Sequence, residues 1–542
     1  ELVDPSGPCE AWTASYDHPA GHQAHGHDQV SDMVVSPSGD VVYMTGASWD
    51  GPMPNGCSGG DYDFATVAIA ASGERLWSAR LGFDTGCLPL EVPTDIAISP
   101  DGSRVFVTGH RGAALWNSDP GHIRLGPGVL TYLTVAYDAT TGEELWNAVY
   151  AGPPPGLDIA HAVEVSPDGS AVLVTGESAG ASGMATIAYD AESGHEIWTS
   201  IWKSPLHPVA FPAFERRAGT DIAFDADGRD AYIAGWNNIV EYCPHPNKPG
   251  QWVTCDLGIE LITLRVDVNT GEIEWLARTE ELDDNTVNCP GSLGIVNCDV
   301  WGANYATARL FVAPDGKRLY LVGFAERTML IRALDPGSGY PLWSDHLPIE
   351  GTLALGQNFG AALAPDGDRL YVSRVTRDTL ARPDEWWPPF TLVKETIAVK
   401  TKNGLQAWDA QVMASGPNGV PPVPVDIPTS VVVSPDSDHV YVSGFVEQWS
   451  AFRGWRSRSF STVSYDAVDD MRNEGAKEWE VRYNSAGPIE NDFDSAWSVA
   501  LTPDGKRFYV GGDFGYATDA AVADLPAGEE NWVDFGLVAY DI

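Results

Sequence analysis

A histidine-rich stretch near the N-terminus contains the residue types that most readily bind metal ions. Residues 16–28 read YDHPAGHQAHGHD, and this stretch ends in three closely spaced histidines and a carboxylate: His22, His25, His27 and Asp28. Imidazole and carboxylate together suit Zn, Cu, Ni or Fe, and a glycine-containing loop is flexible enough to wrap an ion. The spacing matches no defined metal motif, so a solvated histidine-rich loop is the alternative interpretation.

A second acidic pattern is tied to a recurring turn. Asp158 and His161 lie eight and five residues before the turn SPDG that begins at Ser166. This turn recurs, and aligning its copies places at the Asp158 position Asp28, Glu91, Arg217, Tyr305, Gly356, Asp426 and Asp494. We call these eight positions the collar. At the His161 position the same alignment places Ser31, Thr94, Thr220, Ala308, Phe359, Thr429 and Trp497.

The collar has two interpretations. Carboxylates crowded together repel each other unless a cation, a basic partner or raised pKa values relieve them, which favours a divalent metal such as Ca, Cu or Zn. Alternatively, each carboxylate caps the start of its own strand through local backbone hydrogen bonds. The candidate metal ligands from both patterns are His22, His25, His27, Asp28, Asp158, His161, Asp426 and Asp494.

Two repeated signatures indicate the elements that position these residues. Turns of the Pro-Asp-Gly type lie between two apolar runs and begin at Ser36, Ser99, Ser166, Asp225, Ala313, Ala364, Ser434 and Thr502. Each is followed by a hairpin like AYDATTGEELW at 136–146, in which a turn leads to a tryptophan. Each repeat has four short runs rich in β-branched and aromatic residues, and the repeat length of roughly 50 to 90 residues is typical of propellers or solenoids.

The repeats predict an all-β fold, an eight-bladed β-propeller of four-stranded antiparallel blades in a single domain over residues 1–542. The eighth hairpin is divided between the two ends of the chain. The C-terminus stops in mid-motif at 539–542, and residues 8–12, PCEAW, supply the missing half. We therefore expect the strand at 10–16 to pair within 496–542 and to close the ring, which an open solenoid would not require.

The hairpin pattern Ala-x-Asp-x-x-Thr-Gly-x-x-x-Trp resembles the tryptophan-docking motif of the eight-bladed pyrroloquinoline quinone (PQQ) dehydrogenases. The resemblance implies that a set of tryptophans packs between blades: Trp12, Trp77, Trp146, Trp198, Trp275, Trp343, Trp408 and Trp479. The adjacent cysteine pair that covers the cofactor in many members is absent, and the family's Ca²⁺ ligands and catalytic Asp have no local match. Non-catalytic propellers share the motif, including scaffold lipoproteins of outer-membrane assembly, so no catalytic residue is carried over.

Composition limits the partners and the compartment. There are 75 acidic and 32 basic residues, with a formal charge of −43, which argues against nucleic acid as a partner. Three disulfides are predicted from proximity within loops, Cys57–Cys87, Cys243–Cys255 and Cys289–Cys298, with Cys9 left over. No signal peptide or transmembrane segment is visible. We expect a mature secreted protein, extracellular or periplasmic, whose leader has been removed.

The long insertions predict where function resides. Nearly all of them fall at the end of the repeats opposite the tight turns, for example at 110–132, 236–260 and 374–392, and loops on a rigid scaffold commonly carry function. The leading hypothesis is a secreted binding or scaffold protein with an acidic, metal-binding mouth, for a small-molecule, polysaccharide or protein ligand. The alternatives are a PQQ-dependent quinoprotein dehydrogenase, or a metal-dependent (Ca, Cu or Zn) oxidase, lyase or lactonase.

Overall fold

The chain folds as an eight-bladed β-propeller in the computed structural model, which contains strands and no helix among the residues it describes. The described residues are 7–16, 28–52, 60–82, 91–112, 130–154, 156–179, 181, 183–204, 216–244, 252–279, 307–325, 328–348, 359–377, 392–412, 425–449, 456–468, 475–484, 494–516 and 532–542. The fold class predicted from the repeats is therefore confirmed.

Each blade is a four-stranded antiparallel sheet whose strands we name a to d in chain order. Blade 1 contains β2 (Gln29–Val35), β3 (Val41–Pro52), β4 (Gly60–Ala70) and β5 (Arg75–Leu81). Blade 2 contains β6 (Val92–Ile98), β7 (Arg104–Gly112), β8 (Leu130–Asp138) and β9 (Glu144–Tyr150). Blade 3 contains β10 (Asp158–Val165), β11 (Ala171–Ser178), β12 (Gly183–Asp190) and β13 (Glu196–Trp202).

The next two blades follow the same plan. Blade 4 contains β14 (Arg217–Phe224), β15 (Asp230–Pro244), β16 (Trp252–Asp267) and β17 (Ile273–Arg278). Blade 5 contains β18 (Ala308–Val312), β19 (Leu319–Ala325), β20 (Thr328–Leu334) and β21 (Pro341–Pro348). The hairpin of β15 and β16 is paired along its whole length, from Asp230 opposite Asp267 to Pro244 opposite Trp252.

Blades 6 and 7 share one continuous sheet. Blade 6 contains β22 (Gly360–Leu363), β23 (Arg369–Arg377), β24 (Leu392–Lys400) and β25 (Gln406–Val412). Blade 7 contains β26 (Val425–Val433), β27 (His439–Trp449), β28 (Arg456–Asp466) and β29 (Lys477–Tyr483). A parallel bridge between Leu392 and Val425 joins them, so the start of β24 lies directly beside the start of β26.

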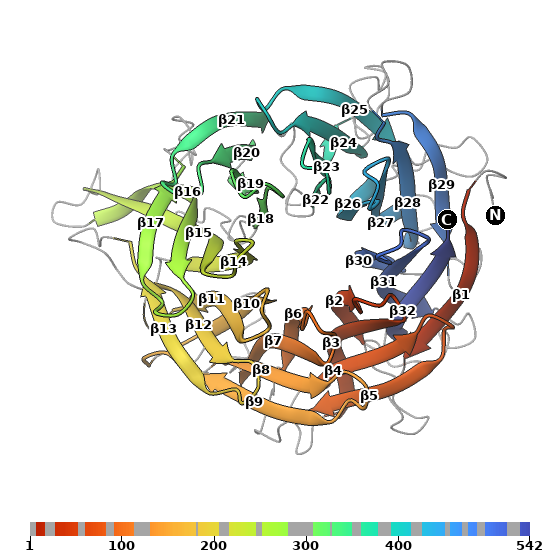
Figure 1. Cartoon of the computed structure of the whole chain (residues 1–542), viewed down its shortest axis with the longest axis horizontal. Helices are drawn as coiled ribbons and strands as arrows, with labels where there is room; N and C mark the ends of the chain where they lie inside the picture. The colour runs from red at the N-terminus through yellow and green to blue at the C-terminus, as the bar shows by residue number, and fades with distance from the viewer. Residues whose placement is uncertain are drawn as a thin grey trace. The chain divides into compact units, whose positions relative to one another are not determined.

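The last blade is built from both ends of the chain, as the divided hairpin predicts. It contains β30 (Ser495–Leu501), β31 (Arg507–Tyr516), β32 (Trp532–Asp541) and β1 (Cys9–Tyr16). Strand β1 pairs antiparallel with β32, from Cys9 opposite Asp541 to Tyr16 opposite Phe535 (Figure 1). The N-terminal strand thus completes blade 8, which is the pairing that closes the propeller.

The chain divides into two compact units. The first comprises Glu1–Gly126, Val135–Asn147 and Asn358–Ile542, and it holds blades 1, 6, 7 and 8 with most of blade 2. The second comprises Pro127–Thr134 and Ala148–Gln357, and it holds blades 3, 4 and 5. Each unit has apolar clusters between neighbouring blades, such as the one that joins Tyr16, Val42 and Phe535.

The docking tryptophans hold neighbouring blades together as the resemblance implies. Trp77 at the outer strand of blade 1 donates its indole N–H to the carbonyl of Ala139, in the c–d turn of blade 2, at 2.9 Å. Equivalent bonds join Trp12 to Ala71, Trp198 to Val268 and Trp275 to Pro336, at 2.7 to 2.9 Å. A ring this large excludes water over a wide area, so each contact contributes strongly to the blade interface.

Glycine is required in the turn that receives each tryptophan. At Gly142 the φ angle is +73°, and a Cβ atom would lie 2.6 Å from the Trp77 ring. Gly271 meets Trp198 in the same way, with φ of +72°. Any other side chain would be strained and would also push the indole away, which explains why the turn reads Thr-Gly or its equivalent in the repeats.

Candidate functional site

The described collar residues all lie at the start of an a strand. Asp158 and Arg217 are the first residues of β10 and β14, Asp426 is the second residue of β26, and the other three immediately precede β2, β6 and β30: Asp28, Glu91 and Asp494. All six side chains are buried, with at most 3% of their surface exposed. Tyr305 and Gly356 lie outside the described residues. The alignment of the repeats therefore identifies one structural position, which is buried in the described blades.

Three collar carboxylates accept hydrogen bonds from their own blade. Asp158 receives the backbone N–H of Gly152 at 2.6 Å and the hydroxyl of Ser178 at 2.7 Å. Asp28 accepts from the backbone N–H of Trp49 at 2.8 Å, and Asp494 accepts from that of Gly515 at 3.0 Å. These are the bonds expected of residues that cap their own strands, and they join strand a to strand b or to the preceding crossing.

Burial governs the ionisation of Asp158. Desolvation raises the pKa of its carboxyl group above the ordinary value, while the hydrogen bonds from Ser178 and Gly152 act in the opposite direction. The two donors stabilise the charged form but do not fully replace water. Asp158 therefore acts as a buried structural acid, fixed by two short hydrogen bonds.

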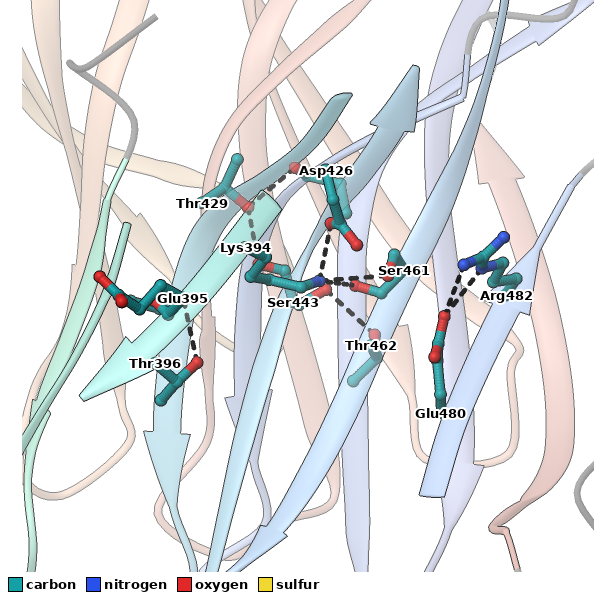
Figure 2. A network of polar contacts seen from close by, with 12 residues as sticks. Lys394, Glu395, Thr396, Asp426, Thr429, Ser443, Ser461, Thr462, Glu480 and Arg482 are labelled. Atoms are coloured by element: carbon teal, nitrogen blue, oxygen red, sulfur yellow. Dashed lines mark hydrogen bonds and ion pairs between the residues drawn. The ribbon is translucent and has the colours of Figure 1, made fainter. Parts of the chain in front are cut away.

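Asp426 differs because its partner is a lysine from the neighbouring blade. Lys394 Nζ on β24 lies 3.0 Å from Asp426 Oδ1 on β26, and neither side chain has any exposed surface. The same ammonium group donates to the hydroxyl of Ser461 on β28 at 3.1 Å and to its carbonyl at 3.4 Å. Figure 2 shows Lys394 reaching from blade 6 across to Asp426 and Ser461 of blade 7.

The lysine replaces an apolar residue of the repeat. In blade 2 the c strand contains the segment TVAYD at 134–138, and the residue two positions before it is Tyr132. The equivalent residues of the eight blades are Phe64, Tyr132, Met184, Leu261, Met329, Lys394, Phe460 and Phe535. Six of the apolar side chains, such as Phe64 and Met184, lie within 3 Å of the Cβ position of a b-strand glycine in the next blade. Only blade 6 places a charge in this column. Aligning the c strands of the repeats would have revealed Lys394 from the sequence alone.

Blade 7 lacks the serine that donates to the collar carboxylate in blade 3. In blade 3, Asp158 lies opposite Ser178 in the strand pairing, and that hydroxyl is one of its two donors. In blade 7, Asp426 lies opposite Val446, which offers no side-chain donor. Among the residues that the structure describes, the Lys394 ammonium is the one polar group that lies against the Asp426 carboxylate.

The His161 position is a β-bulge. The register between strands a and b shifts at this residue in six blades, for example between Ala160 and Ala162 and between Pro428 and Ser430. His161 itself is partly buried there. Where the bulge residue carries a hydroxyl group, it can reach the next blade. Ser31 donates to the carbonyl of Pro93 at 2.6 Å, and Thr429 donates to that of Ala496 at 2.9 Å.

Asp513 was not predicted from the sequence. It lies on β31 beside the collar and accepts the backbone N–H of Val30 of blade 1 at 2.9 Å and the indole N–H of Trp497 at 2.5 Å. Burial raises the pKa of Asp513 to about 7, with nearby Asp494 adding to the effect and Arg458 opposing it. The carboxyl group bridges blade 8 to blade 1. A carboxylate occurs at this column in one other repeat, as Glu177, so no repeat pattern points to it.

The structure does not test the predicted metal site. His22, His25 and His27 lie outside the described residues. Asp158 and His161 both lie on β10 of blade 3, whereas Asp28, Asp426 and Asp494 belong to three other blades. Within the described part of the chain, no group of three or more His, Cys, Asp or Glu residues is arranged to hold an ion. The metal assignment therefore stays a prediction for the histidine-rich stretch.

The disulfide predictions are likewise untested. Cys57, Cys87, Cys289 and Cys298 lie outside the described residues, and the side chains of Cys243 and Cys255 are not described, although their backbones belong to the paired strands β15 and β16. Cys9 is exposed and free, as the prediction that it is left over requires. No helix in the described residues is long and apolar enough to cross a membrane.

Comparisons with known proteins bear on the fold alone. No family model matches the chain, and no curated protein matches its sequence. Quinohemoprotein alcohol dehydrogenase from Comamonas testosteroni is a similar solved structure, with 14% identity, a TM-score of 0.49, and coverage of 98% of this chain and 76% of that one.

Two other solved structures are also similar to this chain. Chaetomium thermophilum Sqt1, in complex with the N-terminus of a ribosomal protein, has 10% identity and a TM-score of 0.48, covering 98% of this chain and 100% of that one. Pseudomonas aeruginosa periplasmic gluconolactonase has 16% identity and a TM-score of 0.37, covering 73% and 87%. At these identities the likeness concerns the β-propeller fold and carries no function to this chain.

Proposed function

We propose that this chain is a secreted binding protein that holds its ligand on the insertions between b and c strands. The observation that supports the proposal is that four collar acids are already bound to other groups of the scaffold. Asp28, Asp158 and Asp494 accept hydrogen bonds from their own blades, and Asp426 pairs with Lys394. Acids used in this way stabilise the scaffold, so they are poorly placed to act as catalytic bases. Recognition then falls to the insertions that the scaffold carries.

The ligand is a small molecule, a polysaccharide or a protein. With a formal charge of −43, the chain would attract cationic ligands from a distance, and such attraction weakens as salt screens it. A divalent cation at His22, His25 and His27 would add a local positive site for anionic groups. Binding of the cation alone can be measured by elemental analysis of protein purified without chelator, before and after substitution of the three histidines by alanine.

The test uses an array of polysaccharides and basic peptides probed with the wild-type protein and two variants. In the first variant, the insertion at 450–455 between β27 and β28 is replaced by a short glycine-serine turn. In the second, the control, exposed residues in the c–d turns of blades 2 and 3 are reversed in charge by Glu143→Lys and Glu192→Lys. We expect the first variant to lose at least one wild-type signal and the control to keep all of them.

Two outcomes would contradict the proposal. The first is a signal that the charge-reversed control loses and the variant without the 450–455 insertion keeps, since binding would then lie at the opposite end of the blades. The second is alcohol or aldehyde oxidation by the protein reconstituted with PQQ and Ca²⁺, abolished by substitution of a collar acid in a variant of unchanged thermal stability. That result would favour the quinoprotein dehydrogenase.

A further inference from the structure

The ion pair of Lys394 and Asp426 has the geometry of two groups placed to react. Nζ and Oδ1 are 3.0 Å apart, and both side chains are fully buried. The backbone bridge between Leu392 and Val425 joins β24 to β26. It lies two residues before Lys394 and one residue before Asp426. Because the strands are fixed so close to the pair, the two groups have little freedom to separate.

Both groups of the pair are shielded from water. Apart from the contact with Lys394 Nζ, neither carboxylate oxygen of Asp426 has a hydrogen bond within the described residues. Passing one proton from the ammonium to the carboxylate removes two buried charges at once. It leaves a neutral amine with a free lone pair beside a neutral carboxylic acid, which are the reactants of amide formation.

We propose that Lys394 and Asp426 form an intramolecular isopeptide bond that covalently joins β24 of blade 6 to β26 of blade 7. The Nζ lone pair attacks Cγ of Asp426, and the C–O bond to one carboxyl oxygen breaks. That oxygen leaves as water with one proton from the amine and one from the acid. The reaction consumes no oxidant and no external reagent, and the net charge of the pair is zero before and after it.

The product satisfies the site better than the ion pair does. The new amide has one N–H, and the hydroxyl and carbonyl oxygens of Ser461 already lie 3.1 and 3.4 Å from Nζ to accept it. The Ser461 hydroxyl can also relay the proton from nitrogen to the departing oxygen. Fixing the two groups in contact raises their effective concentration to roughly 10⁵–10⁸ M, which offsets the slow intrinsic rate of condensation.

A second pair of blades shows what the same position looks like without this chemistry. Leu130 of β8 and Leu157, the residue just before β10, form the equivalent parallel bridge. There Tyr132 stands at the position equivalent to Lys394, and Asp158 accepts hydrogen bonds from Gly152 and Ser178. In blades 6 and 7 the aromatic ring is replaced by lysine and the serine by Val446, so the nucleophile occurs together with an acid that lacks the serine donor of Asp158.

The experiment is mass spectrometry of the full, reduced wild-type chain, followed by tryptic mapping. We expect a mass lower than that of the sequence by one water. Trypsin should fail to cleave after Lys394, and the peptide 378–400 should be recovered joined to the peptide 403–453, which contains Asp426. Lys394→Met, which introduces the residue found at Met184 and Met329, and Asp426→Ala should each restore the full mass and separate the two peptides.

An unmodified wild-type mass, with peptides 378–394 and 403–453 recovered separately, would overturn the proposal. So would a loss of water that maps to the N-terminal peptide, because Glu1 can cyclise with the same mass change when it is the first residue. The decisive result comes from the wild-type chain, so the test stands even if a variant fails to fold.

Discussion

At the scale of single residues, Asp513 makes the stability of this protein depend on pH. Its carboxyl group has a folded-state pKa of about 7, whereas an unfolded aspartate titrates near 3.9. The folded form therefore retains a proton that the unfolded chain has lost between about pH 4 and pH 7. Its contribution to stability is complete below pH 4 and is lost as the pH rises through 7.

We expect the free energy of unfolding to fall from pH 4 to pH 7, with Asp513 contributing on the order of 4 kcal/mol to the fall. Denaturant unfolding of the wild type and of Asp513→Asn across this range measures the contribution as the difference in slope. The variant should be less stable at pH 4, because Val30 and Trp497 donate to different carboxyl oxygens and the amide nitrogen that replaces one of them cannot accept. Its slope should be flatter. Equal slopes would contradict the assignment.

A matched control lies in an exposed turn. Hydrogen bonds from Ser99 and Ser103 lower the pKa of Asp101 to about 2, so its stabilising contribution is present above the unfolded value and is lost only as the pH falls through 2. Asp101→Asn should therefore leave the slope between pH 4 and pH 7 unchanged. The comparison separates the buried acid from the general effect of the high net negative charge.

At the scale of elements, the hairpin that links strands c and d is the unit that joins one blade to the next. Trp77 leaves only 9% of its surface exposed and contacts the rings of Tyr43 and Tyr137, with centroids 5.8 and 6.3 Å away. It also donates to Ala139 and lies against Gly142. One side chain therefore contacts both its own blade and the turn of the next.

We predict that Trp77→Ala lowers the free energy of unfolding by about 3–5 kcal/mol, since it leaves a large cavity between two blades. Trp77→Phe should cost less, because it keeps an aromatic ring but loses the bond to Ala139. The neighbouring Leu76 is 49% exposed and provides the control, and Leu76→Ala should change stability by no more than about 0.5 kcal/mol. Equal effects at the two positions in denaturant unfolding would argue against the docking role.

At the scale of the whole molecule, the pairing of the two chain ends is the contact of longest sequence separation. Tyr16 is 2% exposed and packs on Phe535 with ring centroids 5.5 Å apart, while Trp12 bonds to Ala71 of blade 1. Strand β1 thus supplies the outer strand of blade 8 and its docking tryptophan. Its removal would expose both an edge of β32 and the apolar surface beneath these rings.

We predict that deleting residues 1–16 lowers the melting temperature by roughly 10 °C or more, because several kcal/mol of aromatic burial are lost. Deleting residues 1–6 provides the control, since it leaves β1 complete, and should change the melting temperature little. Thermal unfolding followed by circular dichroism at one scan rate measures both. An unchanged melting temperature for the longer deletion would contradict the closure model.

The sequence by itself determined the blades, the docking tryptophans and the divided eighth hairpin. Those features recur at fixed places in each repeat, because four strands and two tight turns are specified by local patterns such as Pro-Asp-Gly and Thr-Gly. The collar position was also found this way, since Asp28, Asp158 and Asp494 stand at the same distance from a turn. The pattern could not distinguish a carboxylate that caps its own strand from one that binds a metal ion.

Only the tertiary structure decided which groups each buried acid contacts. Asp426 meets Lys394 across a blade interface, and Asp513 meets the backbone of Val30 from the opposite end of the sequence. Such contacts depend on the packing of side chains between sheets. Each of them is found at one blade interface, whereas the repeat pattern occurs eight times. Local sequence fixes backbone conformation within a blade, but the partner of a buried charge is fixed by the neighbouring blade.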